Sequence, residues 1–127
     1  MSVSRIAFIG AGAGAFMALA GGAGDAAEAG ATVLALYKKP ADPKVFDEYY
    51  TTHHAPLAKT LPGLLSYTLS KGLDEKAPYY LVAILSFASA DALIAALASP
   101  QGQAVVGDLK NFAQAGVDVL TFANVPA

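Results

Sequence analysis

The chain has 127 residues, of which 55% are hydrophobic and 14% are charged, and its formal net charge is −2. This length fits one domain with a substantial apolar core, whereas the charge lacks the basic excess that a nucleic-acid partner requires. The sequence has no cysteine, which excludes a disulfide framework, a zinc–thiolate site and a thiol nucleophile.

The first 29 residues differ from the rest. Met1–Arg5 carries one positive side chain, Ile6–Gly24 has no charge, and Ala27-Glu28-Ala29 resembles a cleavage site. These three parts predict a signal peptide, and therefore an exported protein, periplasmic or secreted. One alternative is a retained, disordered N-terminal segment on a cytoplasmic protein. Another is a nucleotide-binding turn at Ile6–Gly14, but such a site needs a helix, a second strand and an acid after it, and the chain is too short to hold these and the domain that follows. The run is too short and too rich in glycine for a stable membrane anchor.

From residue 30 onward the pattern predicts one domain that begins with a strand at Thr32–Lys38. Asp42 followed by Pro43 predicts a helix start, because aspartate caps a helix and proline fits its first turn. Apolar residues then recur at helical spacing. Pro56 predicts that this helix ends or kinks near His54, because proline cannot continue a regular helix.

The second half of the domain predicts the remaining elements. In order they are strands at Leu64–Lys71 and Tyr79–Ala88, a helix at Ala90–Ala98 after Ser89, a helix at about Gln101–Ala113 after Ser99-Pro100, and a strand at Val117–Val125 after Gly116. The order β-α-β-β-α-β is typical of the ferredoxin-like α+β fold.

Two helices can cover only one face of such a sheet. The other face is also apolar, because both alternating sets of side chains in the strand at Tyr79–Ala88 are mostly apolar. A large exposed apolar patch usually marks an interface. Pairing two sheets face to face across a two-fold axis would bury it, so we predict a homodimer.

His54 and Tyr50 are the candidate catalytic residues. At the predicted helix C-terminus the helix dipole favours a cation, so we expect His54 to be protonated. Tyr50 lies one turn earlier on the same face. Such a pair can give or take a proton at a carbonyl or phenol. The alternative is that His54 only hydrogen-bonds a carbonyl and fixes the kink.

Four residues are candidates for substrate binding: Tyr67, His53, Asp108 and Phe112. Tyr67 alternates with Leu65 and Leu69, which places its ring among apolar neighbours with a hydroxyl that needs a partner. His53 lies on the apolar stripe of its helix, where a partly buried or interfacial role is the simpler interpretation. Asp108 precedes Phe112 by one turn, although an acid on a helix is more often solvated.

The sequence predicts no metal and no cofactor. Adjacent histidines on a helix point about 100° apart, so His53 and His54 cannot chelate one ion as an i, i+4 pair does. No phosphate-binding loop and no nucleophile motif is present from residue 30 onward.

Two runs of residues resemble the EthD family: Phe46…Tyr49-Tyr50…His54-Ala55-Pro56-Leu57…Leu61-Pro62-Gly63…Tyr67, and Ala95-Ala96-Leu97…Ser99…Gly102…Asp108-Leu109…Asn111-Phe112. The similarity covers essentially all of residues 30–127. That family belongs to the dimeric α+β barrel group. The resemblance implies that fold, a homodimer, and a small apolar cleft between sheet and helices for a small hydrophobic ligand. Carried over, the histidine of the family's His-x-Pro element is His54.

The resemblance leaves three functions open. The first is a cofactor-free enzyme, an isomerase or cyclase, acting on a small hydrophobic carbonyl or aromatic substrate. In it His54 is the acid or base, and Tyr50 or Tyr67 orients the substrate oxygen. The second is a non-catalytic binding or accessory protein of an oxidative degradation pathway, associated with an oxidoreductase. The third is a haem-binding barrel with His54 as the iron ligand.

Overall fold

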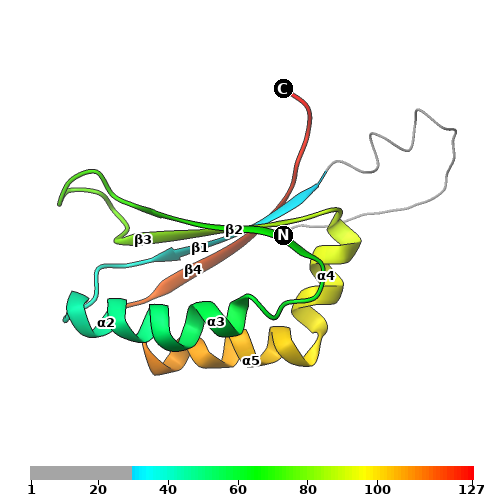
Figure 1. Ribbon diagram of the computed structural model, residues 1–127. Coiled ribbons are helices and arrows are strands. Elements are labelled where there is room, and N and C mark those ends of the chain that lie inside the picture. The colour runs from blue at the N-terminus through cyan, green and yellow to red at the C-terminus, as the bar shows by residue number, and fades with distance from the viewer. Residues whose placement is uncertain (1–29) are drawn as a thin grey trace, which may run out of the picture.

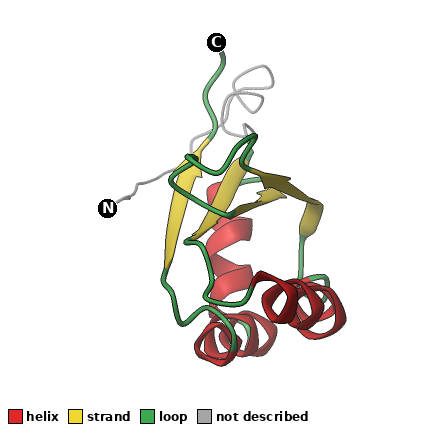
Figure 2. Cartoon of the chain, turned by 90° about the vertical axis from the view of Figure 1, so that its left-hand side faces the viewer, coloured by secondary structure: helices red, strands yellow, loops and turns green. Residues whose placement is uncertain are grey.

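The computed structural model describes residues 30–127, so the predicted signal peptide and the turn at Ile6–Gly14 lie outside the described residues. A four-stranded sheet carries its helices on one face (Figures 1 and 2). The elements in order are β1 (Ala31–Tyr37), α2 (Pro43–Tyr49), the π-helix η2 (Tyr50–His54), α3 (Ala55–Ala58), β2 (Leu64–Lys71), β3 (Leu81–Phe87), α4 (Ala90–Ala98), α5 (Pro100–Asp108), the 3₁₀ turn η3 (Leu109–Asn111) and β4 (Val117–Ala123). This order confirms the predicted ferredoxin-like α+β fold.

The sheet has the strand order β2-β3-β1-β4, and every neighbouring pair is antiparallel. Buried and half-buried side chains alternate along β1 and β3, as expected for central strands with one face on the core. On the helix side, Tyr37 lies opposite Leu81 and Ala35 lies opposite Ala83. This alternation directs the ring of Tyr37 towards the helices.

Side-chain caps begin three helices where the sequence places them. Asp42 accepts a hydrogen bond from the Val45 amide at 3.2 Å and so begins α2. Ser89 accepts one from the Ala92 amide and begins α4, and Ser99 accepts one from the Gly102 amide and begins α5, both at 3.0 Å. Each cap satisfies a backbone donor that has no partner within its own helix.

Of the two alternatives predicted near His54, an end or a kink, the end is wrong, because the chain stays helical to Ala58 through a π-turn at Tyr50–His54. The π-turn η2 accommodates Pro56 by shifting the backbone ladder, so that the Ala55 amide bonds the Tyr50 carbonyl five residues back. Within this wider turn, the hydroxyls of Thr51 and Thr52 both donate to the Glu48 carbonyl. Proline therefore follows a widened turn instead of a break.

Two other predicted boundaries shift. The predicted strand at Tyr79–Ala88 begins only at Leu81, although the Tyr80 amide still bonds the Tyr37 carbonyl of β1. Tyr80 donates its hydroxyl to Asp47 of α2, which also pairs with Lys71 of β2 at 3.1 Å. The predicted helix at Gln101–Ala113 divides into α5 and η3. The tighter turn of η3 brings Phe112 under the sheet, where it is buried.

The face of the sheet opposite the helices has no covering element among residues 30–127 (Figure 2). Its centre is apolar, because Leu34 lies between Ile84 and Leu120 in the strand register, and Leu36 lies opposite Val82. Leu120 is 40% exposed. Within the same described part of the chain, no helix combines the length and apolar character that crossing a membrane requires.

Candidate functional site

An aromatic cluster fills the space between the sheet and the helices. Phe112 lies at its centre, with ring centroids 5.3 Å from Phe46, 5.6 Å from Tyr37 and 5.7 Å from Tyr50. All four residues are buried. Such edge-to-face and tilted pairs add to the stabilisation that burial of their area provides. The cluster forms a rigid apolar wall around the one buried polar residue of the described core, His54.

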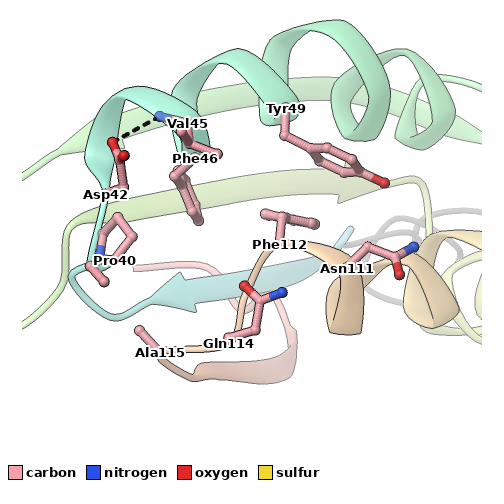
Figure 3. A pocket seen from close by; sticks show the side chains of 10 residues that line it. Pro40, Asp42, Val45, Phe46, Tyr49, Asn111, Phe112, Gln114 and Ala115 are labelled. Atoms are coloured by element: carbon pink, nitrogen blue, oxygen red, sulfur yellow. Dashed lines mark hydrogen bonds between the residues drawn. The ribbon is translucent and has the colours of Figure 1, made fainter.

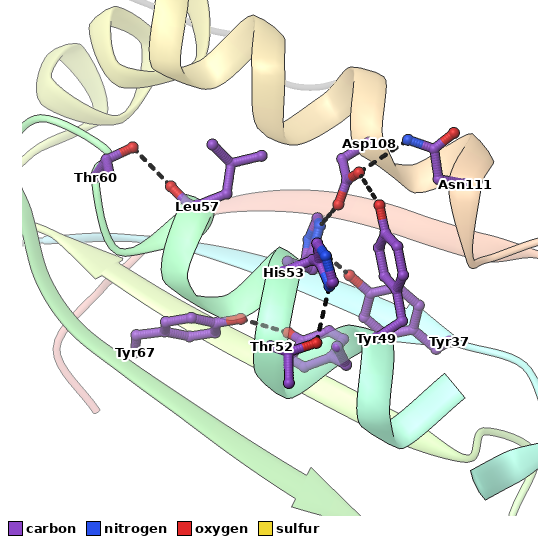
Figure 4. Close-up of polar contacts among 11 residues, drawn as sticks. Tyr37, Tyr49, Thr52, His53, Leu57, Thr60, Tyr67, Asp108 and Asn111 are labelled. Atoms are coloured by element: carbon purple, nitrogen blue, oxygen red, sulfur yellow. Dashed lines mark hydrogen bonds and ion pairs between the residues drawn. The ribbon is translucent and has the colours of Figure 1, made fainter. Parts of the chain in front are cut away.

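His54 hydrogen-bonds protein groups through both ring nitrogens. Its Nδ1 lies 2.9 Å from Oδ2 of Asp108, and its Nε2 lies 3.4 Å from the hydroxyl of Tyr37 (Figure 4). Its ring also lies 4.6 Å from that of Phe112. Three elements therefore fix the imidazole: η2 supplies it, α5 holds one side and β1 faces the other.

Asp108 closes the helical side of this site. Besides His54, it accepts hydrogen bonds on Oδ1 from the Tyr49 hydroxyl at 2.6 Å and from the Asn111 amide at 2.9 Å. Burial of the carboxyl raises the pKa of Asp108, but the hydrogen bonds from Tyr49, Asn111 and His54 outweigh it, so that this pKa is lowered. Asp108 is therefore a carboxylate at neutral pH, and its side chain is only 12% exposed.

The imidazole of His54 is neutral. Burial lowers its pKa from the ordinary 6.5, and the opposing effect of the Asp108 carboxylate is smaller. This corrects the expectation of a protonated His54, because the helix continues past His54 and the ring is desolvated. A neutral ring that faces a carboxylate carries its proton on Nδ1 and leaves the Nε2 lone pair directed at Tyr37.

His54 should make the protein less stable as the pH falls from about 6.5 to 5. Its folded pKa lies below its unfolded value, so the unfolded chain binds more protons in this range. One such group lowers the free energy of unfolding by at most about 1.4 kcal/mol per pH unit. Urea unfolding at pH 7, 6 and 5 should show a steeper decline in the parent than in His54→Gln. His53→Gln should keep the parent decline; an equal decline in His54→Gln would contradict the assignment.

A second polar pair lies beside the imidazole. The hydroxyls of Tyr50 and Tyr67 hydrogen-bond each other, and the Tyr50 ring lies 5.2 Å from that of His54. Burial raises the pKa of both tyrosines. Both hydroxyls therefore stay protonated; one donates to the other, and the hydroxyl that accepts within the pair can donate to a nearby oxygen. Tyr67 is half-buried and connects the cluster to the surface along β2.

The structure brings five of the six predicted site residues together. His54 directly contacts Asp108, Phe112 and Tyr50. Tyr67 joins this group through its hydrogen bond to Tyr50. The sixth residue, His53, is exposed. It stacks on the Tyr49 ring at 4.7 Å and bonds the Thr52 hydroxyl, outside the cluster.

Two partners of the site went unidentified in the sequence. Tyr37 faces His54, and Tyr49 holds Asp108. The inward position of Tyr37 in the alternation of β1 is a signal that could have identified it. Tyr49 offers no comparable signal, because its partner lies 59 residues away.

A pocket of about 460 Å³ opens between α2 and the turn that follows η3 (Figure 3). The rings of Phe46, Tyr49 and Phe112 form its aromatic walls. Its polar lining comes from Asp42, Asn111 and Gln114. His54 does not line it; the Phe112 ring touches both the pocket and the imidazole.

The geometry does not favour haem ligation by His54, because both of its ring nitrogens face side chains within a closed aromatic cluster. Among residues 30–127, no group of three or more histidine, aspartate or glutamate side chains is placed to hold a metal ion. The proton-active groups of the site are thus the imidazole, one carboxylate and the tyrosine hydroxyls.

Fold and cluster together define a ferredoxin-like α+β protein with a buried His–Asp pair between helices and sheet. The chain belongs to the EthD family, because residues 38–116 match the family model described as EthD domain. A Rhodococcus erythropolis protein named "Uncharacterized 11.0 kDa protein in thcB-thcC intergenic region" is 40% identical over 91 residues, which are 69% of this chain and 88% of that protein.

Solved structures agree with this assignment. An ethyl tert-butyl ether d (EthD) family protein from Bacillus halodurans superposes with a TM-score of 0.71 at 25% identity, covering 76% of this chain and 99% of that one. A dimeric ferredoxin-like protein of unknown function from Thermobifida fusca has a TM-score of 0.59 at 20% identity, with 75% and 91% covered. SnoaB, a cofactor-independent oxygenase from Streptomyces nogalater, has a TM-score of 0.59 at 19% identity, with 78% and 96% covered. The last two similarities concern the fold alone.

Proposed function

We propose that this EthD protein is a cofactor-free enzyme that moves a proton on a small, mostly apolar carbonyl or aromatic substrate, with His54 as the base. The observation that carries the proposal is the hydrogen bond from His54 Nδ1 to Asp108, which leaves Nε2 as a lone pair inside an apolar cluster. The contact between Nε2 and the Tyr37 hydroxyl, at 3.4 Å, is long for a hydrogen bond. A small substrate that has entered the closed cluster therefore has only this weak contact to replace at Nε2.

The proposed step is a proton transfer. A C–H next to a carbonyl, or a phenolic O–H, loses its proton to Nε2 of His54, and the electron pair moves onto the substrate oxygen. The Asp108 carboxylate stabilises the imidazolium formed, as an orienting acid does in other His–Asp pairs. Return of the proton to another atom of the substrate completes an isomerisation. Ring closure needs one step more: the enolate carbon attacks a second carbonyl carbon of the same molecule, and the proton returns to the oxygen of that carbonyl.

Tyr50 or Tyr67, whichever hydroxyl accepts the hydrogen bond within the pair, is the proposed donor to the substrate oxygen. Their hydroxyls lie beside His54, and burial keeps them protonated. Preformed donors at the atom where negative charge develops are often the largest single contribution to such catalysis. SnoaB, which has the same fold, is described as a cofactor-independent oxygenase, and this supports chemistry that needs no bound cofactor.

Deuterium exchange tests the proposal without knowledge of the natural substrate. The full chain is incubated in D₂O with a panel of enolisable cyclic ketones, and loss of the α-proton signal is followed by ¹H NMR. His54→Gln should slow the protein-dependent exchange by about a hundredfold or more, the range that general acid–base groups provide. His53→Gln is the matched control and should keep the parent rate. Exchange that is equal in both variants would remove His54 from the mechanism.

We also infer that two copies pair through the open face of the sheet. The support is the apolar centre around Leu34, which no described element covers, and the dimeric state of the protein from Thermobifida fusca. Leu34→Asp should convert a sedimenting dimer into a monomer, because a charge would be buried without a partner. Val106→Asp places the same charge on exposed helix α5 and should leave the dimer intact. A parent that sediments as a monomer would contradict the inference.

A further inference from the structure

The pocket between α2 and η3 carries no role in the proton transfer described above. Its volume of about 460 Å³ is within the range of small-molecule sites, and aromatic rings form much of its wall. Phe112 lines the pocket, and its ring centroid also lies 4.6 Å from that of His54. The pocket is therefore an outer chamber directly beside the buried site.

The polar groups of the pocket define the chemistry of its occupant. The lining contains one carboxylate, Asp42, and no lysine, arginine or histidine, which disfavours an anion. Tyr49 donates its hydroxyl proton to Asp108, so its oxygen can serve any further partner only as an acceptor. Among residues 30–127, the side-chain carbonyl of Asn111 receives no hydrogen bond, while its amide donates to Asp108. Acceptors thus outnumber donors.

Two of the acceptors, those of Tyr49 and Asn111, lie at one end of the pocket, away from Asp42. In Figure 3, Tyr49 and Asn111 lie together at the end of the pocket nearest α5, and Pro40 and Asp42 lie at the other. Both Tyr49 and Asn111 hydrogen-bond the same oxygen of Asp108, whose second oxygen bonds His54. A donor bound at this end would change the hydrogen bonds that hold the His–Asp pair.

We propose that this pocket binds a neutral aromatic compound that carries a hydroxyl group, a phenol, with its ring against the wall formed by Phe46 and Phe112 and the hydroxyl donating to Tyr49 or Asn111. Binding is transmitted to His54 through Asp108. Only the transmission from the pocket to His54 rests on the proposed function. Binding of the phenol itself requires no proton transfer.

Three probes of similar size test the proposal on the full chain by NMR: phenol, anisole and benzoate. Phenol should shift the backbone amides of residues 111–115 and the ring signals of His54. Anisole keeps the ring but has no donor, and it should bind at least threefold more weakly. Benzoate should bind more weakly than phenol, because the lining holds the Asp42 carboxylate and no lysine, arginine or histidine. Equal binding of phenol and anisole would overturn the assignment to hydroxyl compounds.

A filled pocket supplies the second test. Ala115→Leu extends a side chain from the pocket lining, and it should weaken phenol binding at least tenfold and abolish the response of His54. Ala104→Leu makes the same change on the exposed surface of α5 and should leave both unaltered. Two results would overturn this inference. One is a set of phenol-induced changes in chemical shift that centre on Tyr67 and persist in Ala115→Leu. The other is the absence of any such change. The exchange assay with His54→Gln judges the proposed function separately.

Discussion

Asp108→Ala should lower the free energy of unfolding and drive the pKa of His54 further down. The substitution removes the acceptor of the buried Nδ1–H, and an unsatisfied buried donor costs about 1–3 kcal/mol. It also removes the carboxylate, whose hydrogen bond and charge oppose the lowering effect of burial on the pKa of His54. Urea unfolding at pH 7 measures the first effect, and an NMR titration of the imidazole measures the second.

Asp118→Ala is the matched control. Asp118 also accepts a hydrogen bond from a tyrosine hydroxyl, that of Tyr79 at 2.9 Å, but on the exposed end of β4. Its removal should leave the unfolding midpoint and the His54 titration nearly unchanged. If Asp108→Ala behaves like Asp118→Ala, the carboxylate does not hold His54, and the proposed base loses its orienting partner.

Phe112→Ala should be among the most destabilising truncations of the core. The ring lies within 5.7 Å, centroid to centroid, of Tyr37, Phe46, Tyr49, Tyr50 and His54, and the residue is 6% exposed. Truncation of a buried phenylalanine costs about 3–5 kcal/mol, because the lost transfer energy adds to the cavity left behind. Chemical denaturation of parent and variant gives the difference directly.

The same truncation should also join the outer pocket to the imidazole. Phenol would then perturb the ring of His54 even when Ala115→Leu is present, provided that the double variant folds. Leu73→Ala removes a side chain from the exposed loop after β2 and should cost almost nothing. A Phe112→Ala protein as stable as Leu73→Ala would mean that the aromatic cluster does not form the packed centre of the domain.

The fold could be predicted because its signals are local. Asp42, Ser89 and Ser99 each satisfy a backbone donor within three residues, so a short stretch of sequence is enough to identify a helix start. Alternation along β1 and β3 likewise reports one buried face without knowledge of the rest of the chain. These features together determine the order of elements, and the order restricts the topology.

The site could be predicted only in part, because its contacts cross the fold. Helical spacing places Tyr50 near His54, but Asp108 is 54 residues from His54 along the chain. That pair depends on how η2 packs against α5, which spacing within either helix does not determine. The surroundings of Tyr67 show the same limit. Alternation along the strand predicts Leu65 on the same face as Tyr67, but a bulge at Leu65 shifts the alternation, and Leu65 is 67% exposed.

The π-turn at residues 50–54 has a consequence for how this segment can change over generations. A π-turn is a regular helix with one residue added, and the addition sets the phase of everything that follows. Point substitutions within the turn alter side chains but preserve that phase. Loss of a single codon would rotate the downstream helix relative to the sheet and could present a different histidine to its interior. For this segment, insertions and deletions are therefore the genetic events with the greatest power to remodel the chemistry.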